Sequence, residues 1–93
     1  MNTMNAMNTM NSYEATREIM FQRIRALRKR EHITQTDMAQ RLQISRRTYA
    51  NFERGIHAMP VEVLVVIADT FGTSLDYLTG HSPAEFRDVR RVV

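Results

Sequence analysis

Capping residues and glycines divide this chain into short helical segments, and the spacing of these helix start and stop signals limits its fold more than any other feature. A serine or threonine oxygen at a helix start accepts a hydrogen bond from the first turn, and glycine closes a helix in the left-handed conformation. The candidate caps are Ser12, Thr34, Ser45, Ser74 and Ser82, and the candidate closing residues are Gly55, Gly72 and Gly80. The sequence therefore predicts a series of helices joined by short turns.

Apolar residues between these signals recur at helical spacing. Met20, Ile24 and Leu27 mark one face of a helix that begins at Ser12 and ends near Arg30. The helices predicted after it span 34–42, 45–54, 61–71, 74–79 and a short sixth segment from residue 82 onward. No run of alternating apolar and polar residues is flanked by hairpin signals, so the predicted class is all-α.

Local patterns sharpen three of these helix starts. Thr34 with Asp37, and Ser82 with Glu85, have the spacing of a capping box, and Pro60 suits the first position of the helix that follows it. Each pattern satisfies or removes backbone donors that a helix start leaves without partners.

Length and composition allow one small core. A chain of 93 residues accommodates one domain with tails, and the absence of cysteine excludes disulfides, thiolate metal sites and a cysteine nucleophile. The net charge is +3, and Lys29 is the only lysine among the basic residues. The planar guanidinium of arginine suits phosphates and guanine edges. A general preference for arginine in the source genome would explain the same composition.

The ends of the chain are expected to lie outside the domain at 13–80. Residues 1–12, MNTMNAMNTMNS, have no charge and no helical period, which predicts a disordered Met/Asn-rich leader, and Met4, Met7 and Met10 are alternative starts of translation. Residues 81–93 are expected to hold the short sixth helix. The longest apolar run, VLVVIA, is too short to cross a membrane, and we expect a cytoplasmic protein without membrane contact.

The second and third predicted helices have the pattern of a helix-turn-helix at residues 34–54. They are short, with a turn of about three residues between them, Ala39 at their crossing and the apolar Ile44 in the turn. In this motif the second helix lies in the major groove of DNA.

From Ile24 to Leu78 the chain resembles the Cro/Xre-type, lambda-repressor-like helix-turn-helix domain of phage and bacterial repressors. The matching segments are IRALR, ITQTDMAQRLQIS, SRRTYANFERG and IADTFGTSLDYL. The most specific positions are Thr34-Gln35, Ala39, Ile44, Glu53-x-Gly55 and Ser74-Leu75-Asp76. The resemblance implies a compact five-helix DNA-binding domain, to which this chain adds the sixth C-terminal helix.

The resemblance also implies which residues bind DNA. It assigns a phosphate to Gln35, base edges to Arg46 and Arg47 after the cap of the third helix, and a further contact to Asn51 one turn on. The full set expected at the DNA is Gln35, Ser45, Arg46, Arg47, Thr48, Asn51, Arg54 and His57.

The residues themselves favour the same surface. Tyr49 and Phe52 face the core, which turns Arg46, Arg47 and Asn51 outward, and arginine and asparagine form bidentate bonds to guanine and adenine. A solvated helix face is the alternative, and any of these side chains could bind phosphate instead of a base.

The resemblance further implies a structural pair between Arg28 of the first helix and Glu53 near the end of the third. Two positions depart from the family. Gln43 stands where glycine is usual after the second helix, and the left-handed conformation costs a non-glycine residue about 1 kcal/mol. Tyr49 replaces an isoleucine or valine, so its hydroxyl needs a partner or the protein edge.

Other polar residues are expected to have no specific role. We expect the basic residues of the first helix to form a solvated face, because glutamates lie between them; these are Arg17, Arg23, Arg25, Lys29 and Arg30. His32, His57 and His81 are too scattered for a metal site or a catalytic pair. We therefore expect no enzyme, no metal and no cofactor.

The function expected from these patterns is sequence-specific transcriptional regulation. The chain would act as a repressor that occupies a double-stranded DNA operator. The alternative is an antitoxin or another regulator whose tail or leader engages a partner protein.

A homodimer on a palindromic operator is expected, because one helix-turn-helix reads only about half a turn of DNA. The proposed dimer surface is Leu75, Tyr77, Phe86 and Val89, with Val93 on the same helical face. Val63 and Val66 would form a second apolar strip on the fourth helix. The alternative is that this helix is buried on all sides and the sixth helix folds back on its own domain.

Overall fold

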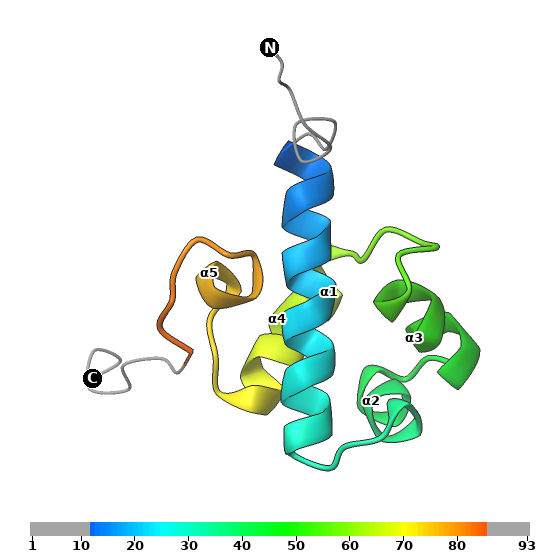
Figure 1. Ribbon diagram of the computed structural model, residues 1–93. Coiled ribbons are helices and arrows are strands. Elements are labelled where there is room, and N and C mark those ends of the chain that lie inside the picture. Colours follow the sequence, from blue (N-terminus) through cyan, green and yellow to red (C-terminus); the bar gives the residue numbers. More distant parts are fainter. Residues whose placement is uncertain (1–11, 86–93) are drawn as a thin grey trace.

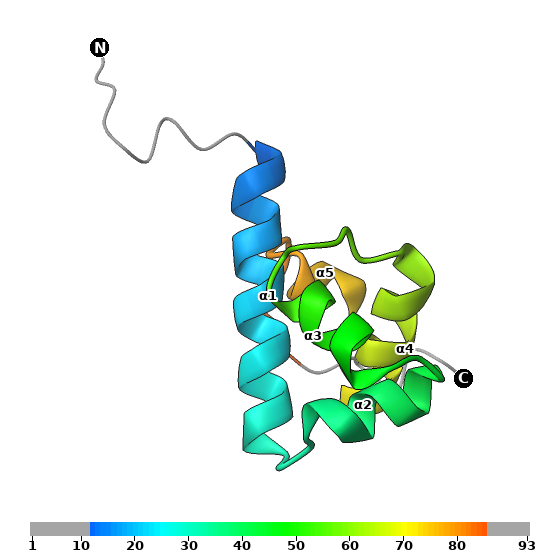
Figure 2. The same ribbon diagram turned by 90° about the vertical axis from the view of Figure 1, so that its right-hand side faces the viewer.

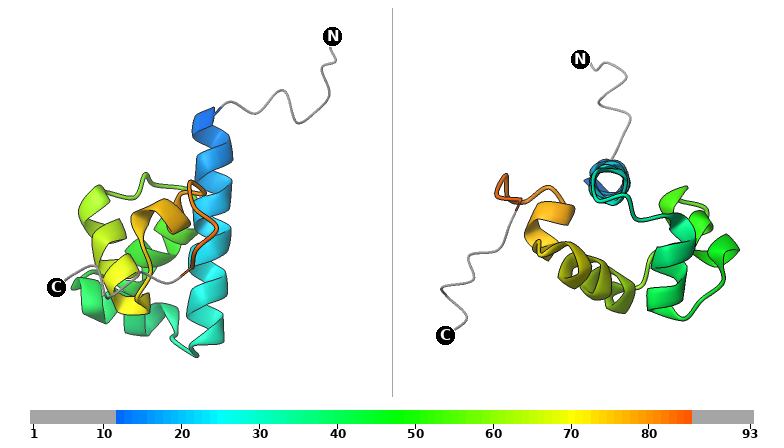
Figure 3. Two further views of the ribbon diagram at one scale, coloured as in Figure 1. Left: turned by 90° about the vertical axis from the view of Figure 1, so that its left-hand side faces the viewer. Right: turned by 90° about the horizontal axis from the view of Figure 1, so that it is seen from below.

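The structure is a computed structural model that describes residues 12–85, and within this range it is all-helical, as predicted. The helices are α1 (Ser12–Arg30), α2 (Gln35–Leu42), α3 (Arg46–Glu53), α4 (Val61–Phe71) and α5 (Leu75–Leu78). In the view of Figure 1 the long α1 runs in front, with α2 and α3 to its right, α5 to its left and α4 behind it. Turned by 90°, α1 is seen to stand along one edge of the domain (Figure 2). Seen along α1, the four shorter helices form an arc beside it (Figure 3).

Each helix contributes one fully buried apolar or aromatic side chain to a common core. These side chains are Ile24, Met38, Tyr49, Ile67 and Leu78, each with 0% exposure. These side chains form one cluster, in which Ile24 comes from the middle of α1. Each short helix therefore buries its apolar face against the other helices.

Three helices, α2, α3 and α5, begin at predicted caps. Thr34 forms a full capping box with Asp37, and the Ser45 and Ser74 side chains accept hydrogen bonds from the N–H groups of Thr48 and Tyr77. These contacts span three residues, which is why local sequence predicted them.

Two boundaries differ slightly from the prediction. Pro60 is the N-cap of α4 and not its first helical residue, and α1 already includes Ser12, which was expected to cap it. The closing glycines behave as predicted: Gly55, Gly72 and Gly80 all have positive φ angles.

Residues 83–85, predicted as the first turn of a sixth helix, are not helical. The Ser82 N–H donates to the Asp76 carbonyl, and the Glu85 carboxylate pairs with Arg30 at 2.5 Å, so the two groups of the expected capping box are bound elsewhere. The Ser82 hydroxyl instead accepts from Ala84 N–H at 3.1 Å. The rest of the predicted helix, including Phe86, Val89 and Val93, lies outside the described residues.

Candidate nucleic-acid interface

A tight turn places α3 beside α2 with one face exposed. The turn is Gln43, Ile44 and Ser45; Gln43 has the left-handed φ of 59°, and Ile44 N–H donates to the Ala39 carbonyl at 3.0 Å. Ala39 is buried where the two helices pack. Figure 2 shows α3 at the front of the domain, with α5 behind it and α4 to its right.

The two faces of α3 differ in character. Tyr49, Phe52 and Glu53 are buried, whereas Arg46 and Arg47 on the first turn are exposed. Among the described residues, no hydrogen bond or ion pair involves either guanidinium, so both are available to an anionic partner.

A hollow lies over the exposed face of α3, and we call it the α3 hollow. Its walls are Gln35, Arg46, Arg47, Ala50, Asn51, Arg54 and Ile56. No acidic side chain lines it, and three of the seven residues are arginine. A concave surface of this charge favours a polyanion such as a nucleic acid backbone.

Five of the eight residues expected at the DNA line this hollow: Gln35, Arg46, Arg47, Asn51 and Arg54. The other three lie outside its walls. Ser45 and Thr48 bond to each other as the cap of α3, and His57 is exposed in the following loop.

Ala50 and Ile56 line the hollow but were not expected at the DNA. Ile56 is 53% exposed, although it is a large apolar residue. Ile56 directly follows Gly55, which closes α3. This position in the sequence could have predicted that the chain turns back there and places Ile56 beside α3. Small and apolar side chains in such a position suit the methyl group of thymine.

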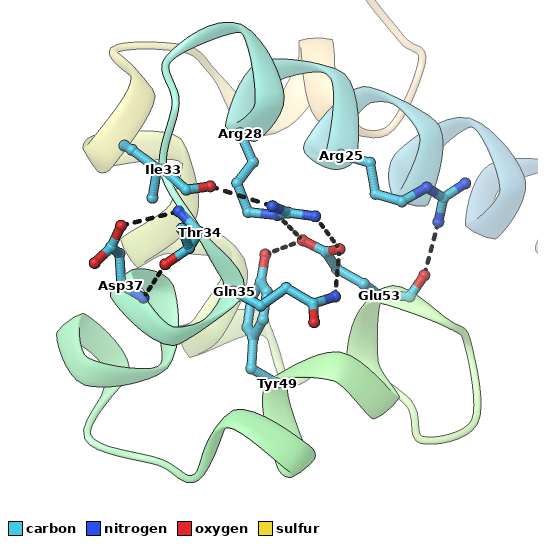
Figure 4. A network of polar contacts seen from close by, with 8 residues as sticks. All are labelled: Arg25, Arg28, Ile33, Thr34, Gln35, Asp37, Tyr49 and Glu53. Carbon is cyan, nitrogen blue, oxygen red and sulfur yellow. Dashed lines mark hydrogen bonds and ion pairs between the residues drawn. The ribbon is translucent and has the colours of Figure 1, made fainter.

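Behind the hollow, the Glu53 carboxylate is the centre of a polar network (Figure 4). Arg28 binds it in a bidentate way, with Nε to Oε2 at 2.7 Å and Nη2 to Oε1 at 3.0 Å. The Tyr49 hydroxyl donates to Oε2, and the Gln35 amide donates to Oε1 at 3.2 Å. The pair expected from the resemblance is thus in contact, and the Tyr49 hydroxyl has a partner.

The network sets the charge of its members. Burial would raise the pKa of Glu53, but hydrogen bonds from Arg28, Tyr49 and Gln35 outweigh it and hold the pKa below its ordinary value. The hydrogen bond with Glu53 raises the pKa of Arg28, and burial raises the pKa of Tyr49 far above its ordinary value. A charged carboxylate therefore joins α1, α2 and α3 at neutral pH.

Gln35 has a partner inside the protein, although a phosphate was expected for it. It is the first residue of α2 and is half-buried beside Glu53. One amide N–H serves Glu53, and a glutamine amide has a second donor. Gln35 can therefore connect the buried network to a group bound in the hollow.

The expectation of a solvated basic face on α1 is wrong for three of its five members. Arg17 donates to the Gly55 carbonyl at 2.6 Å and Arg25 to the Glu53 carbonyl at 2.8 Å. Arg23 donates to the carbonyl of Tyr77 in α5 and to that of Ser82 in the segment after α5. Of the four acceptors, the carbonyls of Glu53 and Tyr77 lie in the last turns of α3 and α5, and those of Gly55 and Ser82 lie in the loops that follow. The three arginines therefore tie α1 to the ends of α3 and α5.

The residues expected at a dimer surface are only partly described. Leu75 is half-buried and lines a second hollow between α4 and α5, and the ring of Tyr77 lies 4.2 Å from the Arg23 guanidinium. Val63 packs against the core, whereas Val66 is exposed, so the two valines do not form the expected apolar strip on the surface. The exposed valines of α4 are Val61, Val65 and Val66.

Comparison with known proteins identifies the family. A model of the helix-turn-helix family matches residues 24–78, more than half of the chain. The chain therefore belongs to the helix-turn-helix family, and the resemblance seen in the sequence over the same residues is confirmed.

The chain is also similar to a bacterial protein named as a transcriptional regulator. The chain is 32% identical over 59 residues to a Bacillus subtilis (strain 168) protein named "Uncharacterized HTH-type transcriptional regulator YobD", covering 63% of this chain and 53% of that protein. The chain thus spans about half the length of this relative. No solved structure matches the chain. None of the helices within residues 12–85 is long and apolar enough to cross a membrane.

Proposed function

We propose that this protein is a sequence-specific double-stranded DNA-binding transcriptional regulator that represses by occupying its operator, in the cytoplasm and without catalysis or a cofactor. The observation that carries the proposal is the α3 hollow, whose lining includes three arginines, a glutamine and an asparagine and no acidic residue. The name of the Bacillus subtilis relative, a transcriptional regulator, points the same way.

In this proposal α3 enters the major groove, where base edges differ for each base pair. Arg46 and Arg47 reach guanine, because a guanidinium matches its two acceptors, and Asn51 suits adenine one turn further along. Both arginines are on the exposed first turn of α3, the end that enters the groove first.

Phosphate contacts would fix the orientation of the domain. Gln35 at the N-terminus of α2 and Arg54 at the end of α3 flank the base-reading residues in the hollow, and His57 follows in the exposed loop. Ser45 and Thr48 act through the α3 cap that holds Arg46 in place. Such contacts add affinity for any sequence.

The proposal includes a homodimer on a palindromic operator. Two copies related by a two-fold axis would place their α3 helices about 34 Å apart, one helical turn of DNA. Leu75 and Tyr77, with Phe86 and Val89, remain the proposed surface, and Leu75 lines the hollow between α4 and α5.

A second candidate function is that of an antitoxin or another regulator that binds a partner protein. The exposed valines of α4 favour it, since Val61 is 60% and Val65 is 41% exposed. A stoichiometric partner that copurifies with the chain would support this candidate.

Selection of bound DNA from a random pool, followed by footprinting, tests the proposed function. We expect a two-fold related sequence with protection over two adjacent major grooves. Enrichment of no sequence, together with uniform weak binding, would contradict it.

A further inference from the structure

The N-terminal part of α1 contacts the segment that follows α3. Residues 12–23 precede the span matched by the helix-turn-helix family, and this end of α1 extends past the other helices (Figure 2). Arg17 lies in this part, yet it reaches a residue 38 positions later in the chain. The family match gives this contact no role.

Two rings of α1 hold the Arg17 side chain. Its guanidinium lies 5.3 Å from the centre of the Tyr13 ring and 5.4 Å from that of Phe21. From this position Nη2 donates to the Gly55 carbonyl at 2.6 Å, a short charge-assisted hydrogen bond. The two rings and the Gly55 carbonyl together therefore hold the Arg17 guanidinium.

Gly55 is closely enclosed by the same residues. A Cβ atom at this position would lie 2.9 Å from Phe21 Cε2 and 3.1 Å from Arg17 Nη2, and the φ angle of 75° also favours glycine. Only a residue without a side chain lets α1 approach the backbone here.

Anchoring Gly55 positions part of the α3 hollow. Its two sequence neighbours, Arg54 and Ile56, both line the hollow, and Ile56 N–H donates to the Asn51 carbonyl at 2.9 Å. Arg25 holds the preceding Glu53 carbonyl in the same way. The C-terminal end of α3 is thus fixed to α1 by two arginines.

We propose that Arg17 is a positioning residue for DNA binding. It fixes the position of the C-terminal end of α3 and of the Arg54–Ile56 segment without touching DNA. This inference rests on the proposed function. A cation suits the site because the C-terminal end of a helix carries partial negative charge. Arg17, which precedes residues 24–78 matched by the family, would thereby support the DNA-binding surface of the helix-turn-helix.

Three variants separate positioning from a charge effect. Arg17→Met keeps an unbranched stem but removes the donor and the charge. Arg17→Lys keeps a donor and the charge, and Lys29→Met removes one charge from an exposed position of α1. We expect Arg17→Met to weaken binding to the selected DNA about tenfold, Arg17→Lys to recover part of it, and Lys29→Met to change it about twofold or less. Circular dichroism checks the fold of each variant.

The salt dependence of binding is the first discriminating readout. A lost phosphate contact lowers the slope of log affinity against log salt by about 1, whereas a lost positioning contact leaves it unchanged. We expect the slope of Arg17→Met to equal that of the wild type. A slope reduced by about 1 would make Arg17 a phosphate contact and overturn the inference.

Amide hydrogen exchange without DNA is the second readout. We expect faster exchange at Ile56 and His57 in Arg17→Met, since their N–H groups bond to the Asn51 carbonyl in the anchored segment. Unchanged exchange, or faster exchange with unchanged affinity, would overturn the inference while DNA binding stands. Failure of the wild type to bind any DNA would instead overturn the proposed function.

Discussion

A single carboxylate, that of Glu53, joins three helices at the residue scale. It is 1% exposed and accepts hydrogen bonds from Arg28, Tyr49 and Gln35. Burying a charge is costly, and full hydrogen bonding with an opposite charge is what offsets that cost. The network therefore orients α3 relative to α1 and α2, and removing one member leaves another charge without its partner.

Stability should depend on pH through Glu53. Its folded pKa lies below the ordinary 4.5, so its stabilisation is fully present above that value and is lost as pH falls through the lower folded pKa. Glu53→Gln should lower the free energy of unfolding by about 3 kcal/mol at neutral pH, and the difference from wild type should shrink as the pH falls below 4.5 toward the lower folded pKa.

Urea unfolding across this pH range measures the effect. Glu18→Gln, which changes an exposed carboxylate inside α1, is the matched control and should alter stability little. An undiminished effect of Glu53→Gln in acid would show that the carboxylate charge is not the stabilising feature.

At the element scale, the turn between α2 and α3 combines a strong cap with a strained residue. Ser45 caps α3, while Gln43 closes α2 at a φ of 59° and a ψ of 41°. Glycine would adopt this conformation without the steric cost of a side chain. The helix-turn-helix is therefore formed with less than its maximal stability.

Gln43→Gly should stabilise the protein by about 0.5–1 kcal/mol, the relief of strain less the added freedom of the unfolded chain. Gln40→Gly, at an exposed position inside α2, is the matched comparison and should destabilise by about 1 kcal/mol. Thermal unfolding of both variants checks the prediction, and a loss of stability in both would contradict it.

At the scale of the whole molecule, the described part of the proposed dimer surface, Leu75 and Tyr77, lies on α5 and not among the residues that line the α3 hollow. Sedimentation at micromolar concentration should show a dimer that Phe86→Asp and Val89→Asp weaken, because a buried charge without a partner opposes association. Val61→Asp, on the exposed face of α4, is the control. A wild type that stays monomeric on a palindromic operator would contradict the dimer, and dissociation by Val61→Asp alone would move the interface to α4.

Sequence predicted the parts of the molecule that depend on neighbouring residues. Thr34 and Ser45 cap their helices because each cap bonds within one turn, and the outward position of Arg46 follows from the core-facing Tyr49. The tertiary arginine contacts could not be predicted this way. Arg17 meets a carbonyl 38 positions away, and nothing local distinguishes it from the solvent-exposed Lys29.

The central claim is that the exposed face of α3 reads DNA. The most direct test is a titration of the selected operator with the double variant Arg46→Ala/Arg47→Ala, beside Lys29→Ala/Arg41→Ala, which removes two exposed charges elsewhere. We expect the α3 variant to lose about 1–3 kcal/mol of binding free energy per arginine and to lose discrimination at one or two base pairs, while the control keeps its sequence preference. Unchanged affinity and preference in the folded α3 variant would contradict the claim.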